Sequence, residues 1–274
     1  MRELGYLEGK NFIFEFRISE GKTERLPGLA AELARAKCDV IVAAGPEAVI
    51  RAAQQAAGVI PVVMVAIDFD PVATGYIKSL RRPGVNTTGL HLQQIELTAK
   101  RMELLKELFP KARRIAVLSE TTTTDQLAAA RRAAQTLGIA VQPMELRDPP
   151  YNYAAIFETM KKGKPDAVLV MQAGVFFRDR TELANQSLKH KLPGAYGQSE
   201  FAEAGGLFSY GANISDIFLR VADYVDRILK GSAVAVMPVE QPTKFEVVIN
   251  LKTAKALGIK VPQTILLRAD RVIE

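Results

Sequence analysis

The chain has 274 residues, of which 48% are hydrophobic and 24% are charged, and its formal net charge at pH 7 is +6. This composition is that of an ordinary globular protein with one large or two medium domains. The single Cys38 excludes an internal disulfide framework and a multi-cysteine metal site, and no apolar stretch reaches the roughly 18 residues that a membrane-spanning helix needs. Lysine and arginine are scattered among acidic residues, so we expect no nucleic-acid partner.

The chain begins with an unusual order of elements. RELGYLEGKN reads as a helix end and a glycine-bounded loop, and FIFEFR (12–17) reads as a strand. No signal peptide precedes these elements, whereas a doubly wound domain normally begins with a strand near the sheet centre. We therefore expect the chain to start one βα unit late, as a truncated form or from a misplaced start. The sheet of the first lobe is then expected to show a gap or an unpaired interior edge beside strand 12–17 or strand 40–44.

Strands and helices alternate along the rest of the chain. The apolar runs are short and continuous, which is typical of parallel strands buried on both faces. The further predicted strands are 40–44, 61–65, 86–90, 114–119, 140–146, 167–171, 194–197, 205–211 and 244–250. The predicted helices are 23–37, 46–57, a short one near 71–80, 94–108, 125–137, 152–162, 178–190, 214–230 and one begun by Asn250 as an N-cap. The predicted fold class is α/β, with two doubly wound parallel-sheet lobes and a central cleft.

The lobe boundaries are predicted from breaks in this alternation. The pattern restarts after Pro110, and glycine and proline interrupt it near 209–211 and again near 236–243. The first lobe is therefore expected to contain residues 1–112 and about 210–238. The second lobe is expected to contain residues 113–209 and about 239–274.

Catalytic motifs are missing from the sequence. A GxSxG nucleophile motif, a P-loop, a dinucleotide-binding GxGxxG, HExxH and CxxC are all absent. His190 lies at a predicted helix end, where a cation interacts well with the helix dipole. His91 follows a predicted strand on the cleft side, so we treat it as a candidate ligand contact. No cofactor and no metal ion is expected, and an enzyme is the least favoured class of function.

Candidate binding residues lie in the loops that follow the strands, because ligands of parallel α/β sheets bind outside the carboxyl ends of the strands. In the first lobe, the main chain of Gly45 and Pro46 at a helix start suits an anionic group. Carboxylates there suit an ammonium, and they belong to Glu47, Asp68 and Asp70. The second lobe offers polar side chains at Ser119, Glu120, Thr121, Gln172, Tyr196 and Glu200, and aromatic rings for stacking at Phe176 and Tyr196. For each polar residue the alternative is helix capping, a turn or solvation; Asp70 before Pro71 also fits a turn cap.

Several segments together resemble a known family over the whole chain. They are RELGYLEGKNFIFEFR, DVIVAAGPEAV, IDFDPVATGYIKSLRRPGVNTTG, ELLKELFP, EAGGLFSYG, DYVDRILKG and QPTKFEVVINLKTAKALGIKVPQTILLRADRVIE. They are similar to ABC transporter substrate-binding proteins of the tryptophan/tyrosine type. The resemblance implies a type I periplasmic-binding-protein fold that closes two lobes on a small-molecule ligand and delivers it to ABC permease subunits in the membrane. It also implies a periplasmic or extracytoplasmic location for the full-length protein.

Two other classes of function remain open from the sequence. A cytoplasmic small-molecule sensor with the same fold would need no export signal, although no helix-turn-helix segment is present. A small-molecule enzyme is third. An aromatic amino acid or a related solute is the ligand that the resemblance suggests.

Overall fold

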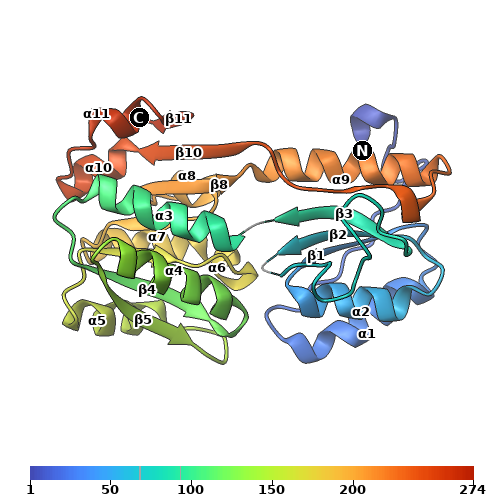
Figure 1. The fold of residues 1–274 in the computed structure, drawn as a ribbon, viewed down its shortest axis with the longest axis horizontal. Helices are drawn as coiled ribbons and strands as arrows, with labels where there is room; N and C mark the ends of the chain where they lie inside the picture. Colours follow the sequence, from blue (N-terminus) through green and yellow to red (C-terminus); the bar gives the residue numbers. More distant parts are fainter. Residues whose placement is uncertain (68, 93) are drawn as a thin grey trace. The chain divides into compact units, whose positions relative to one another are not determined.

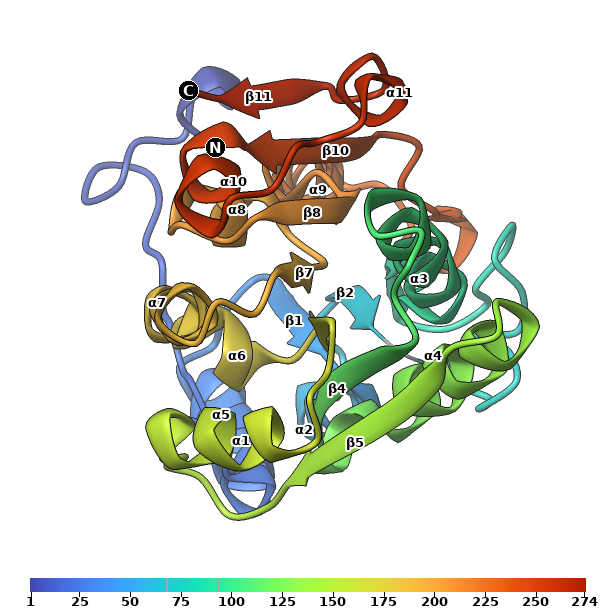
Figure 2. The same cartoon turned by 90° about the vertical axis from the view of Figure 1, so that its left-hand side faces the viewer.

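The computed structural model describes residues 1–67, 69–92 and 94–274, and the chain divides into two α/β units (Figures 1 and 2). Unit 1 consists of Met1–Gln93 and Ile214–Pro242, and unit 2 consists of Gln94–Asn213 and Thr243–Glu274. The chain therefore passes between the units three times.

Unit 1 is built on a parallel sheet with the strand order β1-β2-β3-β9. These strands are β1 (Ile41–Gly45), β2 (Val62–Ile67), β3 (Thr87–Leu92) and β9 (Val239–Glu240). Helices α1 (Leu26–Arg35) and α2 (Glu47–Ala57) lie on one face of this sheet, and α9 (Ile214–Leu229) packs against β2 and β3 (Figure 1). Short 3-10 helices occur at Arg2–Leu4, Thr23–Arg25 and Val234–Val236. The core forms where alternate strand side chains, such as Met64, meet Ile50 and Ala53 of α2.

Two elements predicted for unit 1 are wrong. Residues 12–17 form no strand, and the predicted helix near 71–80 is a series of turns. The alternating side chains of residues 12–17 match a strand, but a strand also needs a hydrogen-bonding neighbour along its length. Within the described residues this segment has one isolated bridge, between Phe12 and Glu8, and joins neither sheet. Strand β1 ends the unit 1 sheet on one side, and the expected gap or unpaired interior edge stays a prediction.

The segment 12–18 exposes apolar side chains on both of its sides. Ile13 is 79% exposed and Phe16 is 63% exposed. Phe14 lies 6.2 Å from Phe16, ring centroid to centroid, in a stacked arrangement. An exposed apolar segment of this kind favours association between chains.

Charged residues in this segment should therefore reduce self-association. We expect Ile13→Lys combined with Phe16→Glu to raise the monomer fraction in size-exclusion chromatography with light scattering, with stability changed by no more than about 0.5 kcal/mol. Val59→Lys is the control, because Val59 is also highly exposed but lies outside this segment. An unchanged monomer fraction at high concentration would contradict this expectation.

Unit 2 is built on a sheet with the strand order β11-β10-β8-β7-β6-β4-β5. Only the β8–β10 pair is antiparallel among the described pairs of this sheet. The strands are β4 (Arg114–Glu120), β5 (Ala140–Leu146), β6 (Ala167–Val170), β7 (Gly194–Tyr196), β8 (Phe208–Ala212), β10 (Phe245–Asn250) and β11 (Arg271–Ile273). The helices are α3 (Gln94–Leu108), α4 (Thr124–Thr136), α5 (Tyr153–Lys162), α6 (Gly174–Arg178), α7 (Arg180–Lys189), α8 (Ser199–Glu203), α10 (Leu251–Leu257) and α11 (Gln263–Leu266), with a 3-10 turn at Thr121–Thr123.

Both faces of the unit 2 sheet are covered, as the continuous apolar runs predict. Along β4, Ile115 and Val117 point into a core shared with α3 and α4, whereas Ala116 and Leu118 point into a core shared with α5, α6, α7 and α8. The predicted N-cap at Asn250 is confirmed, because its side chain accepts a hydrogen bond from the Thr253 amide at 3.0 Å.

The units divide at positions that differ from the sequence-based boundaries. Helix α3 belongs to unit 2, so the first passage of the chain precedes α3 instead of following it near residue 112. The reason is packing, because Met102 and Leu105 of α3 share a core with Leu127 of α4. The second passage lies between Asn213 and Ile214, and the third lies between Pro242 and Thr243.

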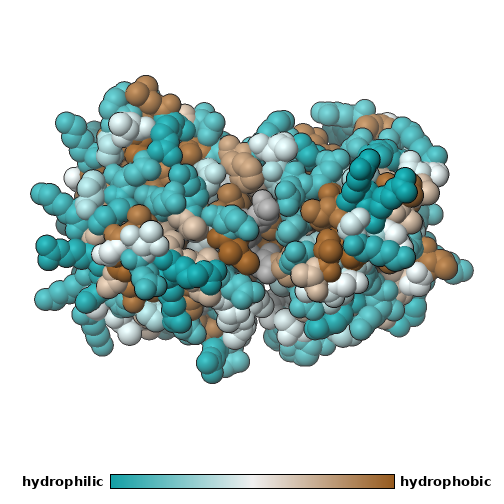
Figure 3. All heavy atoms as spheres, viewed as in Figure 1, coloured by the Kyte–Doolittle hydropathy of each residue, from teal (hydrophilic) through white to brown (hydrophobic). Residues whose placement is uncertain are grey.

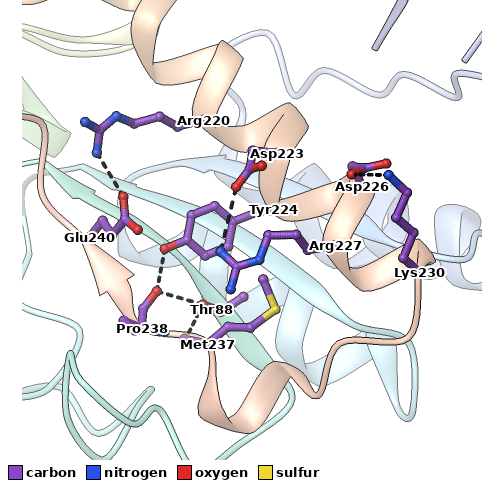
Figure 4. Close-up of polar contacts among 10 residues, drawn as sticks. All are labelled: Thr88, Arg220, Asp223, Tyr224, Asp226, Arg227, Lys230, Met237, Pro238 and Glu240. Carbon is purple, nitrogen blue, oxygen red and sulfur yellow. Dashed lines mark hydrogen bonds and ion pairs between the residues drawn. The ribbon is translucent and has the colours of Figure 1, made fainter. Parts of the chain in front are cut away.

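In unit 1, the elements next to these passages are joined by a polar network (Figure 4). Arg220 of α9 bonds to Glu240 of β9 at 2.9 Å and to Asp216 at 3.2 Å. The Tyr224 hydroxyl donates to the Pro238 carbonyl. Burial, and to a smaller extent the negative charge of Glu240, raises the pKa of Tyr224. Thr88 of β3 donates to the Met237 carbonyl at 2.8 Å. These contacts hold α9, β9 and β3 together.

Thr88→Val should test the contribution of this network to stability. Thr88 is fully buried, and the substitution keeps its shape but removes the donor for the Met237 carbonyl, so we expect a loss of about 1–2 kcal/mol in the free energy of unfolding. Thr136→Val is the control, because Thr136 is an exposed residue of α4. Urea denaturation of the two variants measures the difference, and equal midpoints would contradict the prediction.

None of the described helices is both long enough and apolar enough to cross a membrane. On the face shown in Figure 3, hydrophilic residues predominate on both units, and hydrophobic residues are scattered among them.

Candidate functional site

Three predicted residues follow β1 in unit 1. Gly45 has a φ of 152°, and a Cβ at this position would lie 2.8 Å from Val49 Cγ2, so the turn into α2 requires glycine. Pro46 is the N-cap of α2. Glu47 begins the helix, and its Oε1 accepts a hydrogen bond from the Tyr76 hydroxyl at 2.7 Å. Burial and this bond raise the pKa of Tyr76. The Glu47 carboxylate is thus already engaged within unit 1.

Asp70 caps a turn, which is the alternative that the sequence left open for it. Its Oδ1 accepts bonds from the Val72 amide at 2.8 Å and the Ala73 amide at 3.2 Å. Asp68 lies outside the described residues. His91 lies in β3, in register with Ala66 of β2. The predicted pair of carboxylates after β2 therefore has one described member, and that member stabilises its own loop.

Three further predicted residues lie where β4 ends. Ser119 is 1% exposed, and its Oγ has no hydrogen-bond partner among the described residues. Glu120 instead forms a capping box with Thr123, in which the Glu120 amide donates to Thr123 Oγ1 at 3.0 Å. The Glu120 carboxylate also accepts bonds from the hydroxyls of Thr121 and Thr122. The Ser119 hydroxyl is therefore available to bond to a ligand, whereas the side chains of Glu120 and Thr121 bond to each other.

The end of β6 lies beside the end of β4, since Leu118 is in register with Val170. Gln172 follows this end and belongs to a buried polar cluster. Gln126 of α4 bonds to its main chain, and Arg101 of α3 donates to its Oε1 at 3.2 Å. Arg101 was not predicted from the sequence. A signal was available, because Arg101 lies four residues after Leu97 and four before Leu105, on the apolar face of the predicted helix 94–108.

The two predicted aromatic contacts belong to the core. Phe176 and Tyr196 are both fully buried, so neither side chain is open to a solute. Tyr196 stacks on Phe201 with 4.6 Å between ring centroids, and its hydroxyl lies 2.9 Å from Ser187 Oγ. Burial raises the pKa of Tyr196 to about 12. These rings shape unit 2 from inside, and the structure assigns them to packing instead of stacking on a ligand.

Glu200 lies in α8, shortly after β7. Its Oε2 is buried and has no hydrogen-bond partner among the described residues. An unpaired carboxylate oxygen in a buried position is costly unless a donor arrives from outside the chain. Glu200 and Ser119 thus each have a buried polar atom that can bond to a ligand. The carboxylates of Glu47, Asp70 and Glu120 are instead bonded within the chain.

Other kinds of site have little support in the described part of the chain. No group of three or more His, Cys, Asp and Glu side chains among these residues could hold a metal ion. A pocket with a volume of about 270 Å³ in unit 1 is lined by residues that include Gln54, Tyr76 and Thr87. It lies near the amino ends of β2 and β3 and contains none of the predicted binding residues.

Known proteins resemble this chain over nearly its whole length. The tyrosine-binding protein of Clostridioides difficile is 25% identical over 263 residues, which cover 95% of this chain and 74% of that protein. The structure of a conserved domain protein from Vibrio cholerae matches with a TM-score of 0.85 and 24% identity, covering 99% of this chain and 90% of that one. The structure of an ABC domain from Streptococcus pneumonia in complex with L-Trp matches with a TM-score of 0.84 and 24% identity, covering 99% and 91%.

These structures confirm the predicted fold class, a mixed α/β fold of the periplasmic-binding-protein type. The model of the family described as ABC transporter substrate binding protein matches residues 1–273. The family is one of substrate-binding proteins and not of enzymes. The chain belongs to the ABC transporter substrate-binding protein family.

Proposed function

We propose that this chain is the solute-binding component of an ABC importer, that its solute is an aromatic amino acid, and that it acts without catalysis. Family membership supports solute binding and delivery to a membrane permease. The choice of solute is supported by the relatives, since one is named a tyrosine-binding protein and another was solved with L-Trp. An extracytoplasmic location is part of this proposal.

The observation that carries the proposal lies in unit 2, near the carboxyl ends of β4, β6 and β7. Ser119 Oγ and Glu200 Oε2 are buried polar atoms without partners among the described residues, and Gln172 follows the strand between them. An unsatisfied buried polar atom costs about 1–3 kcal/mol, so a solute that pairs with these atoms gains affinity. An amino acid carries both an ammonium for the carboxylate and a carboxylate for the donors. Contacts from the main chain of Gly45 and Pro46 in unit 1 remain a prediction.

A thermal-shift panel on the whole chain tests the proposed function. L-tyrosine, L-tryptophan and L-phenylalanine are compared with L-lysine, L-glutamate and sucrose. A solute at 100 times its Kd stabilises the folded state by about 2.7 kcal/mol, so the aromatic amino acids are expected to raise the Tm and the others to leave it unchanged. A shift produced by a non-aromatic solute and by none of the aromatic ones would contradict the proposal.

A further inference from the structure

The position of Gln172 is fixed by bonds to its main chain. Gln126 Nε2 donates to the Gln172 carbonyl at 2.9 Å, and the Gln172 amide donates to Gln126 Oε1 at 2.9 Å. Gln126 is itself fully buried. Because both bonds come from one buried side chain, the main chain after β6 is held where the Gln172 side chain begins.

The side-chain amide of Gln172 is fixed in one orientation. Arg101 NH2 donates to Gln172 Oε1, and a guanidinium can only donate. The amide oxygen must therefore face Arg101, and the NH2 group must face the other way. Nε2 has no acceptor among the described residues, it is not one of the fully buried atoms, and Gln172 is 8% exposed. The group that Gln172 presents is a hydrogen-bond donor.

Arg101 is held firmly enough to set this orientation. It is 1% exposed, and its Nε donates to the Tyr210 carbonyl at 2.7 Å. A glycine leaves space for the pair. A Cβ at Gly197 would lie 2.7 Å from Gln172 Oε1 and 3.0 Å from Arg101 NH2. Gly197 has no φ in the left-handed region, so space and not backbone conformation explains it.

We propose that Gln172 binds the solute by donating a hydrogen bond from Nε2 to an oxygen of its carboxylate, and that Arg101 is the positioning residue that fixes this polarity. The inference rests on the proposed function and adds the chemistry of one position in the site. A solute group that can only donate, such as an ammonium, is rejected here because the amide NH2 offers it no acceptor.

Calorimetry with three probes and the variant Gln172→Glu tests this polarity. Desaminotyrosine keeps the carboxylate of L-tyrosine and lacks the ammonium, whereas tyramine keeps the ammonium and lacks the carboxylate. In Gln172→Glu an anionic oxygen replaces the donor, so affinity for L-tyrosine and desaminotyrosine should fall about 30-fold or more, and affinity for tyramine should not fall. Gln135→Glu is the control, because it adds the same charge at an exposed position of α4.

The role of Arg101 is read from the ratio of the two analogue affinities. Arg101→Met removes the donor to Gln172 Oε1 and so allows the Gln172 amide to rotate. The preference for desaminotyrosine over tyramine should then fall about tenfold, which corresponds to one hydrogen bond of roughly 1.4 kcal/mol. Arg101→Lys keeps a donor and should retain more of the preference. General damage to the fold lowers both affinities and leaves the ratio unchanged, and Gln172→Glu decides the question if Arg101→Met does not fold.

The outcomes separate the inference from the proposed function. If wild type binds L-tyrosine and Gln172→Glu binds all three probes within threefold of wild type, the polarity inference is wrong and the proposed function stands. If wild type binds none of the aromatic amino acids and neither analogue, both are wrong.

Discussion

Replacing Gly89 by alanine is expected to destabilise unit 1 by about 3 kcal/mol, from backbone strain and overpacking together. Gly89 lies in β3, between β2 and β9, with a φ of 130° that L-residues rarely adopt. A Cβ there would lie 2.1 Å from the carbonyl oxygen of Met64, its register partner in β2. Backbone atoms of a buried strand cannot move aside without breaking the β2–β3 pairing.

The control is the same substitution at Gly28. This glycine lies in α1 and is exposed, and a Cβ added to it would have no described atom within 4 Å. Alanine favours a helix over glycine by about 0.5–1 kcal/mol, so Gly28→Ala should stabilise the chain slightly. Urea denaturation followed by circular dichroism compares the two variants. A Gly89→Ala midpoint at or above that of wild type would show that the close approach of β3 to β2 is not required.

Replacing Glu200 by glutamine is expected to weaken amino-acid binding about 30-fold or more, since losing one partner of a desolvated charge pair costs about 2–5 kcal/mol. The buried Oε2 of Glu200 has no partner among the described residues, and glutamine keeps its size but removes the charge that an ammonium needs. Stability should change much less than affinity. Calorimetry with L-tyrosine measures the loss.

Two comparisons make this prediction specific. Asp70→Asn should leave affinity within about threefold of wild type, because Asp70 Oδ1 is engaged in its own turn. Desaminotyrosine, which has no ammonium, should bind wild type and Glu200→Gln equally well. If Glu200→Gln binds L-tyrosine as tightly as wild type does, Glu200 is not the ammonium partner.

The sheets could be predicted from the sequence because their strands are buried on both faces. Runs such as 114–119 and 167–171 are continuously apolar, and the structure contains β4 and β6 at these places. Residues 12–17 show the limit of such patterns, because alternating side chains do not reveal whether a strand has a neighbour. Helix α3 shows another limit, since the apolar pattern of a helix does not reveal which of two sheets the helix packs against.

The sequence predicted where in the sheet the candidate site lies, but not which of its side chains are free to contact a ligand. The parallel-sheet rule led to the ends of β4 and β6, where Ser119 and Gln172 lie. Sequence alone could not show that Glu120 bonds to its own neighbours or that Tyr196 stacks on Phe201. The spacing of helix 94–108 could have shown that Arg101 is buried, but it could not show its partners Gln172 and Tyr210, which are 71 and 109 residues away along the chain.

A fluorescence-anisotropy titration with L-tryptophan would reveal aromatic amino-acid binding without a label. The chain contains no tryptophan, so light absorbed only by indole reports the solute and not the protein. We expect a saturable rise in anisotropy as protein is added, reversed by excess L-tyrosine and unaffected by excess L-lysine. Anisotropy that stays at the value of free L-tryptophan while circular dichroism shows folded protein, at concentrations up to the solubility of the chain, would contradict aromatic amino-acid binding.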